Sequence, residues 1–452
     1  MNRSLVVGRV ESLSEVSTWG DRVLDEARRS AVRRGEAVWV SARVAMGEPA
    51  AVDALSLASP ALTWAFREPD GRVTLGWGEA LGVRADGAGA LGAAASRLQA
   101  LAATANLPTD LWVGGGAAFQ AGRSWRGFPD ASLVLPELAV RREPDGSGWW
   151  QLVARVPPSG ALRPPRLLPR VPGTAASLLG ATLRTTRFVP RPERWRDQVA
   201  VVVRALDRGR VGKVVLARAV DLGLAEPVDL DALWVALTED AGASVFLVRQ
   251  AGGVFLGATP ELLARVQGRR VFTQAVAGTE RADANPDVLL GRPKDRREHR
   301  VVVEAIVRRL GRLADDVVAD PIRAVRAGPV CHLVTPVAGW LRPEQGLYDV
   351  LAALHPTPAV GGEPPGAALA WQRRLEATAR GWYAGPVGLA EIGGASGAFY
   401  VGLRSAWVRG RRVRLFAGCG LVRGSNPDQE LSESSQKLGV MVQALAGGEA
   451  PS

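Results

Sequence analysis

Three lysines stand out in a chain that otherwise takes its positive charge from arginine. Of the 56 basic residues, 53 are arginine, and the lysines are Lys213, Lys294 and Lys437. Arginine stays protonated, whereas lysine can lose its proton when it is buried or placed near other cations. Each lysine is therefore a candidate for proton transfer, although a few lysines also remain by chance in an arginine-rich sequence.

Lys437 belongs to a set of charged residues that are spaced to share one face of a helix. Glu430, Glu433 and Lys437 are three and four residues apart, which places them on the same side of an α-helix. The triplet Asn-Pro-Asp at 426–428 predicts the helix start, with the asparagine as N-cap and the proline in the first position. The same spacing also suits a solvated helix face that a Glu–Lys pair stabilises.

The segment before this helix is expected to bring backbone close to a ligand. Residues 412–417 alternate between apolar and other side chains, which predicts a strand. Gly418, Cys419 and Gly420 follow, and we expect a turn there, because glycine lets a backbone approach a ligand. Residues 412–437 are thus predicted to form a strand, a glycine turn and a helix.

The composition limits the classes of protein that the chain could be. A length of 452 residues with 47% hydrophobic content is sufficient for a large core. The net charge of +11 comes from scattered arginines with interleaved acidic residues, which suits an anionic small substrate at least as well as nucleic acid. Two cysteines argue against a disulfide framework and fit a reducing cytoplasm. The apolar N-terminal patch is too short for a signal peptide, and no segment is long enough for a membrane span.

Residues 1–174 are predicted to form a β-rich half with few catalytic side chains. Three glycines at 114–116 follow a predicted strand, but no helical pattern comes after them, so a dinucleotide-binding loop is rejected. The proline-rich segment 157–172 separates this half from residues 185–440. Because both halves show the pattern of antiparallel sheet with interspersed helices, we expect residues 1–452 to form a single intertwined domain.

The second half places candidate acid–base groups at the ends of predicted elements. Lys213 opens an apolar strand over 214–218, where burial would favour loss of its proton. The triplet Thr-Pro-Glu at 259–261 predicts a helix start, and a glutamate there is also a common dipole-stabilising residue. Asp295 and Glu298 are three residues apart at the start of a long predicted helix.

Nine motifs of this second half resemble, in the same order, those of the chorismate-utilising enzymes. They are GKVVLAR around Lys213, GATPELLAR around Glu261, AVAGT at 275–279, KDRREH at 294–299, HLVT at 332–335, LHPTPAVGG at 354–362, GWYAGPVG at 381–388, YVGLRSA at 400–406 and AGCGLVRGSNPDQELSES at 417–434. The first half is similar more loosely, through 114–116 and WRGFPDASLVLP at 125–136. The resemblance implies an α+β fold of two large antiparallel β-sheets packed together, with helices on the outside.

Within the family, the motifs are most similar to those of the isochorismate synthases of the menaquinone type. This implies an isomerase that adds water at C2 of chorismate and expels the C4 hydroxyl, for menaquinone or siderophore biosynthesis. Lys213 matches the family's base for water, and Glu261 matches its acid for the leaving hydroxyl. Further matches concern Mg²⁺ and the substrate. They are Glu298 and Glu433 as metal ligands, Glu430 and Asp295 lining the metal site, Arg404, Tyr383, Lys437, Gly418 and Gly420 at the substrate carboxylates, and Gly278, Thr279, His332 and Thr357 in the pocket wall.

Lys213 also distinguishes between activities in the family. The anthranilate and aminodeoxychorismate synthases usually carry glutamine there and use ammonia, and the latter tend to have a lysine where this chain has Ala277. Salicylate synthases keep the lysine and then eliminate pyruvate, so they are the alternative. The loop 355–362 is more similar to the menaquinone-type enzymes. The chain departs from the family pattern in one segment. Residues 280–292 are fewer than is usual there, and Glu280 stands where an arginine is common.

An inactive paralogue or a basic nucleic-acid-binding protein is the alternative from a different class. Nucleic-acid binding predicts clustered arginines with interleaved aromatic residues, but the tryptophans are spread along the chain. An inactive paralogue predicts loss of Lys213, Glu261, Glu298 or Glu433, and all four are present. We therefore expect a cytoplasmic, monomeric enzyme with chorismate as substrate, Mg²⁺ as cofactor, and neither nucleic acid nor a membrane as partner.

Overall fold

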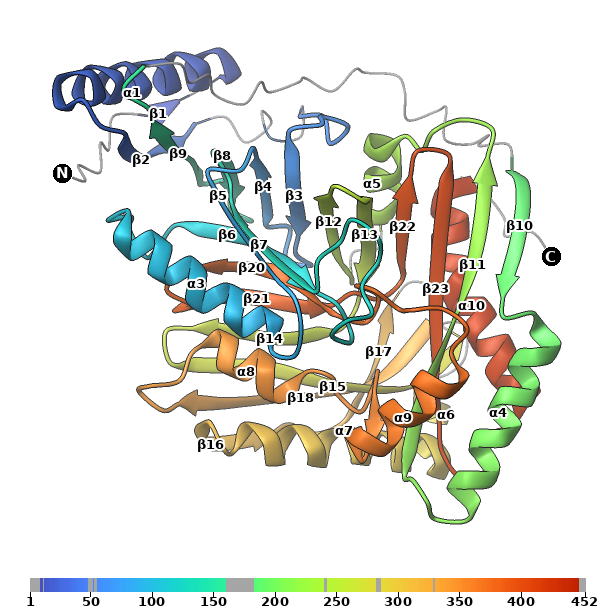
Figure 1. Ribbon diagram of the computed structural model, residues 1–452. Coiled ribbons are helices and arrows are strands. Elements are labelled where there is room, and N and C mark those ends of the chain that lie inside the picture. Colours follow the sequence, from blue (N-terminus) through green and yellow to red (C-terminus); the bar gives the residue numbers. More distant parts are fainter. Residues whose placement is uncertain are drawn as a thin grey trace.

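Two large β-sheets make up most of the protein in the computed structural model (Figure 1). The structure describes residues 9–10, 12–47, 52, 55–159, 183–239, 242–281, 286–327 and 330–446, apart from some side chains in these ranges, among them those of Thr279, Glu280 and Lys294. Most of the proline-rich segment 157–172 and part of the short segment 280–292 lie outside the described residues.

The first sheet has 13 strands among the described residues, and all neighbours are antiparallel except β1 and β2. In spatial order the strands are β1 (Arg9–Val10), β2 (Val38–Met46), β9 (Gly148–Val156), β8 (Leu138–Arg142), β4 (Val73–Trp77), β3 (Leu62–Arg67), β12 (Ser244–Gln250), β13 (Gly253–Thr259), β22 (Ser405–Arg409), β23 (Arg412–Leu421), β11 (Lys213–Leu224) and β10 (Leu183–Val189), with β19 (Gly362–Glu363) paired to β11.

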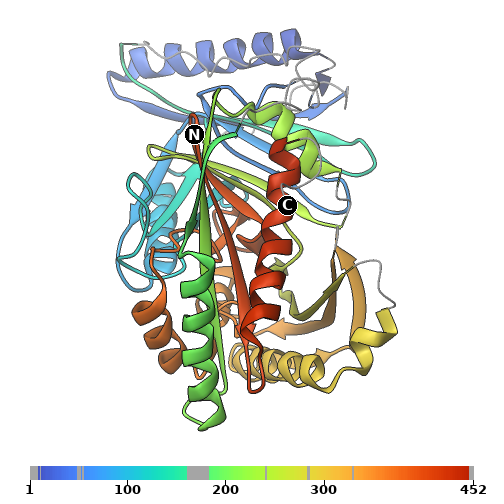
Figure 2. The ribbon, with the colours of Figure 1, turned by 90° about the vertical axis from the view of Figure 1, so that its right-hand side faces the viewer.

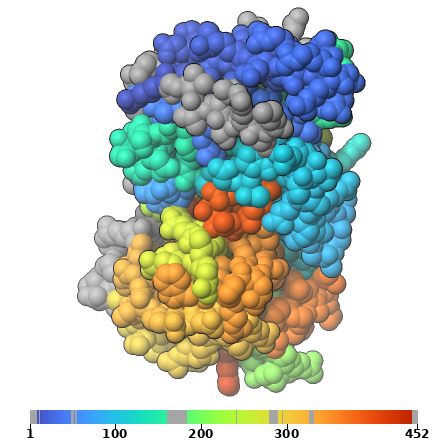
Figure 3. Space-filling model, turned by 90° about the vertical axis from the view of Figure 1, so that its left-hand side faces the viewer, coloured from blue at the N-terminus to red at the C-terminus, as the bar shows by residue number. Residues whose placement is uncertain are grey.

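The second sheet has 10 described strands and is antiparallel throughout. Its order is β16 (Ala314–Ala319), β18 (Val330–Leu341), β15 (Arg270–Arg281), β14 (Leu262–Gln267), β21 (Ser396–Val401), β20 (Pro386–Glu391), β6 (Trp112–Ala117), β7 (Ala131–Leu135) and β5 (Leu81–Ala85), with β17 (Arg323–Ala327) paired to β18. Both sheets contain strands from both halves of the sequence, and the two halves also share the face seen in Figure 3. This mixing supports our proposal that residues 1–452 form one domain.

Helices cover the outside of the two sheets. They are α1 (Leu13–Arg34), α3 (Ala90–Thr104), α4 (Pro192–Asp207), α5 (Leu230–Thr238), α6 (Pro286–Gly291), α7 (Pro293–Leu310), α8 (Leu347–Leu354), α9 (Pro365–Leu375) and α10 (Pro427–Ala446). Figure 2 shows α4 and α10 side by side over one face of the first sheet. The predicted α+β fold, with two large antiparallel sheets and outer helices, is confirmed.

The chain passes between the sheets several times, and two of these connections lie next to each other. Strand β13 of the first sheet leads into β14 of the second through Glu261, and β21 of the second leads into β22 of the first through Arg404. The N–H of Val401 donates to the carbonyl of Glu261 at 3.0 Å, and the N–H of Ala258 donates to the carbonyl of Arg404 at 3.1 Å. The backbone of Glu261 is thus hydrogen-bonded to the end of β21, and the backbone of Arg404 to β13.

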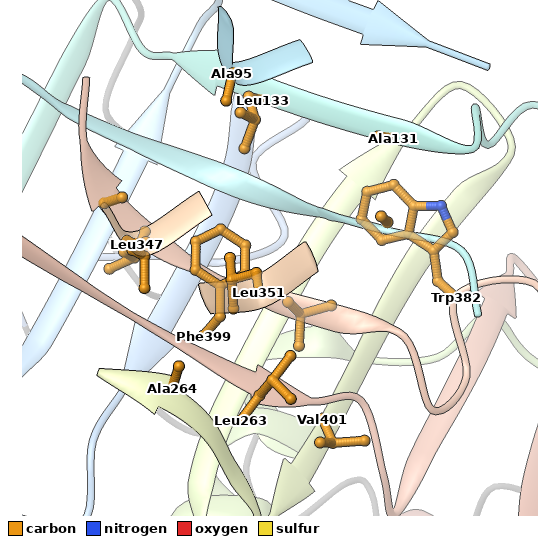
Figure 4. Close-up of a cluster of buried hydrophobic side chains, with 14 of the residues drawn as sticks. Ala95, Ala131, Leu133, Leu263, Ala264, Leu347, Leu351, Trp382, Phe399 and Val401 are labelled. Carbon is orange, nitrogen blue, oxygen red and sulfur yellow. The ribbon is translucent and has the colours of Figure 1, made fainter. Parts of the chain in front are cut away.

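The largest apolar core involves both sheets and the helices α3 and α8. Figure 4 shows part of it, with Leu263 and Phe399 of the second sheet near Leu347 and Leu351 of α8. Each of these side chains is at most 1% exposed. Burying one such side chain contributes about 1.5–3 kcal/mol. The core therefore gives the connections between the sheets a rigid support.

The glycines at 114–116 lie in β6 and are required by packing. A Cβ at Gly114 would lie 2.6 Å from the indole of Trp64 in the first sheet, and a Cβ at Gly115 would collide with the carbonyl of Ser132. Trp64 is fully buried, and its Nε1 donates to the carbonyl of Val134 at 3.2 Å, so the ring cannot move aside. Packing thus explains the glycine run, and no dinucleotide-binding role is needed to account for it.

We expect Gly114→Ala to lower the free energy of unfolding by about 1–3 kcal/mol, because the new methyl group would overlap with Trp64. Gly92→Ala in α3 is the matched control, since a Cβ there meets nothing within 4 Å. The control should be neutral or stabilising by about 0.5–1 kcal/mol, because alanine suits a helix better than glycine. Urea denaturation followed by tryptophan fluorescence measures both, and equal stability of the two variants would contradict the packing argument.

Candidate active site

Lys213 begins β11, as predicted, and is fully buried. Its Nζ lies 2.8 Å from Oε1 of Glu298, which projects from α7 and is 12% exposed. The two side chains meet next to Gly420 of β23. A Cβ at Gly420 would lie 2.9 Å from Cε of Lys213 and would overlap with Oε1 of Glu298. Glycine at this position therefore makes room for the ion pair.

The glycine turn predicted after residue 417 is wrong. Gly418 and Gly420 lie inside β23, which pairs with β11 as far as Leu421, and the turn follows at 423–424. The ladder to β11 supplies the backbone hydrogen bonds that keep the glycines extended. Their role is close approach, as expected, but the groups that approach them in this structure belong to the protein itself. A Cβ at Gly418 would lie 3.1 Å from the hydroxyl oxygen of Tyr383.

The helix predicted to start at 259–261 is also wrong. Thr259 ends β13 and Leu262 begins β14, so Glu261 lies in the connection between the sheets. The hydroxyl of Thr259 accepts from the N–H of Glu261 at 3.2 Å and donates to the carbonyl of Val401 at 2.6 Å. The threonine therefore stabilises a turn between two strands, through the same side-chain acceptor that would otherwise cap a helix.

Glu261 is a buried carboxyl group that can hold a proton near neutral pH. Burial raises its pKa to about 7, against the lowering effects of Lys213, of the Thr357 hydroxyl and of Lys437. The Thr357 hydroxyl donates to Oε1 at 3.5 Å, a long contact. A carboxyl group with this pKa is well matched to donating a proton at pH 7.

Arg404 is fixed by a neutral histidine. Its NH2 donates to Nε2 of His332 at 2.8 Å, and Nδ1 of His332 lies 3.1 Å from the carbonyl oxygen of Gly278. Burial, Arg404 and Lys437 lower the pKa of His332 to about 3. The ring is therefore neutral, with Nδ1 donating and Nε2 accepting. Arg404 also has a positive φ of 43°, which is uncommon for a residue with a side chain.

Helix α10 begins where the sequence predicts. Oδ1 of Asn426 accepts from the N–H groups of residues 428 and 429 at 2.9 and 3.2 Å, which confirms the N-cap. Further along, Nζ of Lys437 donates to Oε1 of Glu433 at 2.6 Å and to the carbonyl of Gly418 at 3.2 Å. Burial lowers the pKa of Lys437, but the Glu433 carboxylate raises it more, so the net pKa is raised. Lys437 therefore acts as a permanent cation.

These groups surround a pocket with about 780 Å³ of space free of atoms, counting the part open to solvent. The predicted residues that line it are Glu261, Gly278, Glu298, His332, Tyr383, Arg404, Gly418, Gly420, Glu433 and Lys437. The structure thus brings together acidic and basic groups from α7, β18, α10 and the connections through Glu261 and Arg404, beside the glycines of β23.

Four predicted residues lie behind this lining and not in it. Lys213 reaches the pocket through Glu298, and Thr357 through Glu261. Asp295 is buried close to Gly278, where a Cβ would lie 3.3 Å from the Cβ of Asp295. Glu430 is 2% exposed on α10. The side chain of Thr279 lies outside the described residues.

Sequence reasoning missed Arg380 and Glu376. Arg380 lines the pocket and is 4% exposed, and its guanidinium is ion-paired with the buried Glu376. Phe416 was missed as well. It stacks on Tyr383 with ring centroids 5.1 Å apart and forms an apolar wall of the pocket. The position of Arg380 directly before the Gly-Trp-Tyr motif was the available signal, but in a chain with 53 arginines a single arginine is not informative.

The donor groups of this site fit a hard divalent cation. Glu298 and Glu433 both line the pocket, and carboxylate oxygens of Glu430 and Glu433 lie within 4.8 Å of one another and of Sγ of Cys419. Burial raises the pKa of the Cys419 thiol well above its ordinary value. A protonated thiol is a poor ligand, so the oxygen ligands that Mg²⁺ prefers remain.

Comparison with known proteins agrees with this geometry. Residues 29–446 match the family model described as chorismate binding enzyme. The chain belongs to this family. It is 38% identical over 352 residues to the salicylate biosynthesis isochorismate synthase of Pseudomonas aeruginosa, with 71% of each chain covered. It is 34% identical to isochorismate synthase MenF of Bacillus subtilis, with 56% of this chain and 55% of the relative covered.

The chain is also similar to a solved structure over nearly its whole length. MenF, the menaquinone-specific isochorismate synthase from Escherichia coli, superimposes with a TM-score of 0.77 at 25% identity, covering 94% of this chain and 100% of that chain. The chorismate-utilising family expected from the motifs is thus confirmed. In the part of the chain that the structure describes, no helix is long and apolar enough to cross a membrane.

We expect Glu261→Gln to stabilise the protein at alkaline pH. Folding raises the Glu261 pKa from 4.5 to about 7, so its neutral form is favoured in the folded state. The contribution of Glu261 to the free energy of unfolding is therefore fully present below about pH 4.5 and is lost as the pH rises through 7. The loss amounts to about 3 kcal/mol. Urea denaturation of both proteins at pH 5 and 8.5 tests this, and an equal difference at both pH values would contradict the buried, protonated carboxyl.

Proposed function

We propose that this protein is an isochorismate synthase, which converts chorismate to isochorismate by adding water at C2 and expelling the C4 hydroxyl. The observation that carries this proposal is a fully buried lysine, which reaches the pocket through Glu298, together with a buried glutamic acid that lines the same pocket. The family and the names of the relatives support the same reaction. An ammonia-using enzyme of this family would be expected to have glutamine in place of Lys213.

Two proton transfers are needed, and two groups are available for them. Lys213 is the proposed base, which takes a proton from the water that attacks C2. Glu261, with a pKa of about 7, gives a proton to the hydroxyl that leaves C4. The charge of Lys213 lowers the pKa of Glu261, so the two groups interact. Placing a base and an acid at one pocket is what a hydroxyl migration requires.

The two carboxylates of chorismate require fixed cations. Arg404 is oriented by His332, and Lys437 is oriented by Glu433 and the carbonyl of Gly418. Both cations line the pocket. Because their partners hold them in place, little side-chain entropy is lost on binding. Tyr383, stacked on Phe416, offers its hydroxyl on the same side as Gly418.

We further propose that Glu298 and Glu433 hold Mg²⁺, with Glu430 and Asp295 around it. When bound, the ion neutralises the ring carboxylate of the substrate. The position of Glu430 supports this, since one of its carboxylate oxygens lies within 4.8 Å of a carboxylate oxygen of Glu433. We also propose a cytoplasmic, monomeric enzyme. The buried free cysteines Cys331 and Cys419 fit a reducing compartment, and light scattering tests the monomer.

The main product is expected to be isochorismate. Incubation with chorismate and Mg²⁺, with and without ammonium, followed by chromatography, tests this expectation. Salicylate with stoichiometric pyruvate would replace the isochorismate assignment by salicylate synthase. Anthranilate would contradict the role of Lys213, and no conversion would contradict the proposed function.

We expect Lys213→Ala to reduce kcat by about 10²–10⁴, the usual effect of removing a positioned base. Lys213→Arg is the matched control for charge. Arginine keeps the cation but cannot be deprotonated, so it should be similarly inactive. Steady-state kinetics on folded protein measures both variants. Recovery of activity in the arginine variant would show that position 213 needs only a positive charge.

Glu433→Gln should raise the Mg²⁺ concentration needed for half-maximal activity by at least about 10-fold, in line with losses measured at metal sites. Asp428→Asn on the same helix is the control, because Asp428 is 74% exposed and pairs with Arg196. Titration calorimetry with Mg²⁺ gives a second measurement that does not depend on turnover. Full activity of EDTA-treated wild-type protein would rule out the metal.

A further inference from the structure

The edge of β11 that faces away from β23 is only partly paired with other strands. β19 pairs with Lys213 and Val214, and β10 pairs with residues 219–224. Among the described residues, no strand pairs with residues 215–218 on this edge (Figure 1). Backbone groups that are buried without a partner cost about 1–3 kcal/mol each. Other groups must therefore satisfy the strand directly beside Lys213.

Side chains of α9 and of the segment directly after it take the place of the missing strand. The carbonyl of Val215 accepts from Nε2 of Gln372 at 2.9 Å and from NH2 of Arg380 at 2.8 Å. The N–H of Ala217 donates to Oε1 of Glu376 at 3.0 Å. Gln372, Glu376 and Arg380, each four residues apart, are called the α9 clamp below.

The other side of the α9 clamp holds the loop at 355–362. Nε2 of Gln372 also donates to the carbonyl of Gly361 at 2.6 Å, and NH1 of Arg380 donates to the carbonyl of Val360 at 2.8 Å. The same loop carries Thr357, whose hydroxyl contacts Glu261. The N–H of Val215 also donates directly to the carbonyl of Gly361 at 3.1 Å. The α9 clamp therefore reinforces the contact between the strand of the proposed base and the loop that contacts the proposed acid.

The α9 clamp is rigid because its charged members are buried and fully engaged. Glu376 and Arg380 have side chains that are 5% and 3% exposed, and Nε of Arg380 donates to both carboxylate oxygens at 3.0 Å. The guanidinium also lies 4.1 Å from the ring centroid of Phe119. Each nitrogen of Arg380 thus has a protein partner, although the residue borders the pocket. Lysine could not reproduce this planar set of donors.

We propose that Gln372, Glu376 and Arg380 are positioning residues, which keep Lys213 and Glu261 at the separation that the reaction needs by fixing β11 to the loop at 355–362. The inference rests on the roles proposed for Lys213 and Glu261. These residues act through the backbone of Val215, Ala217 and Val360. Loss of the clamp therefore affects the rate of the chemical step more than it affects substrate binding.

Arg380→Lys tests the proposal. We expect kcat to fall by at least about 10-fold with KM changed less than about threefold, since small misplacements of catalytic groups can cost up to about 10²-fold. Arg374→Lys is the matched control on α9, because Arg374 is exposed and lies over Trp371 at 5.7 Å. The control should retain wild-type kcat and KM. Circular dichroism and thermal denaturation give the folded fraction of each variant.

A double-mutant cycle separates positioning from general loss of structure. If the α9 clamp acts through Lys213, then Arg380→Lys should reduce kcat much less in the Lys213→Ala background than in the wild type. Additive losses would overturn the proposal, and so would a loss fully explained by the unfolded fraction. A rise in KM at unchanged kcat would also overturn it, by showing that Arg380 binds substrate directly.

A second variant covers the case in which Arg380→Lys does not fold. Glu376→Gln keeps the size of the side chain but removes the charge that holds Arg380, and it should show the same fall in kcat at nearly constant KM. Wild-type kcat in this variant would overturn the proposal. Failure of the proposed function is recognised separately, as absence of chorismate turnover by the wild type or full activity of Lys213→Ala.

Discussion

The ion pair between Lys213 and Glu298 is the interaction on which the site depends. Lys213 is fully buried and Glu298 is 12% exposed. A charge buried as deeply as that of Lys213 is stable only with a close partner, and removing one partner of a buried pair typically costs about 3–5 kcal/mol. The pair fixes β11 against α7, and glycine at 420 provides the space for it. The next residue of α7, His299, adds no further charge, because burial and Lys213 lower its pKa to about 4. Its Nε2 lies 2.8 Å from the hydroxyl of Thr335 in β18, which ties the same helix to the second sheet.

The site lies where the chain changes sheets, and this placement has a physical reason. Inside a sheet, backbone pairing and alternation decide where each side chain points, and most inward positions are taken by the core. At the connections that contain Glu261 and Arg404, the backbone leaves one ladder before it enters the next, so these side chains can turn into the pocket. The positive φ of Arg404 and the turn at Thr259 are local consequences of that change. The surrounding core supplies the rigidity that a pair of irregular connections lacks.

Much of the fold and of the candidate site could be expected from the sequence. The two-sheet fold and the site residues were expected from the resemblance to the chorismate-utilising enzymes, and several single elements from short-range patterns. The cap at Asn426, the strand at Lys213 and the helix that carries Glu298 follow from local rules and are confirmed. The two errors, at 259–261 and at 418–420, share a cause. A Thr-Pro-Glu triplet can start a helix or connect two strands, and a Gly-Cys-Gly run can form a turn or continue a strand. Only the pairing with β11, β21 and β22 decides which conformation forms. Arg380 could not be found at all, because its function depends on carbonyl groups about 20 and 165 residues away in the sequence.

The charge balance of the pocket accounts for the separate use of lysine and arginine. Glu298 is paired with Lys213 at 2.8 Å and Glu433 with Lys437 at 2.6 Å, so each carboxylate that would hold the metal already faces a lysine. Compact ammonium groups can share a carboxylate with a metal ion, whereas a guanidinium that binds both carboxylate oxygens in a fork would occupy them. At position 404 the neighbouring side chain is a neutral histidine and not a carboxylate that would also bind the metal, so an arginine fits there. Binding Mg²⁺ together with a doubly charged substrate would leave the balance unchanged, because the two charges cancel. Filling the pocket with both together would therefore add no net charge to it.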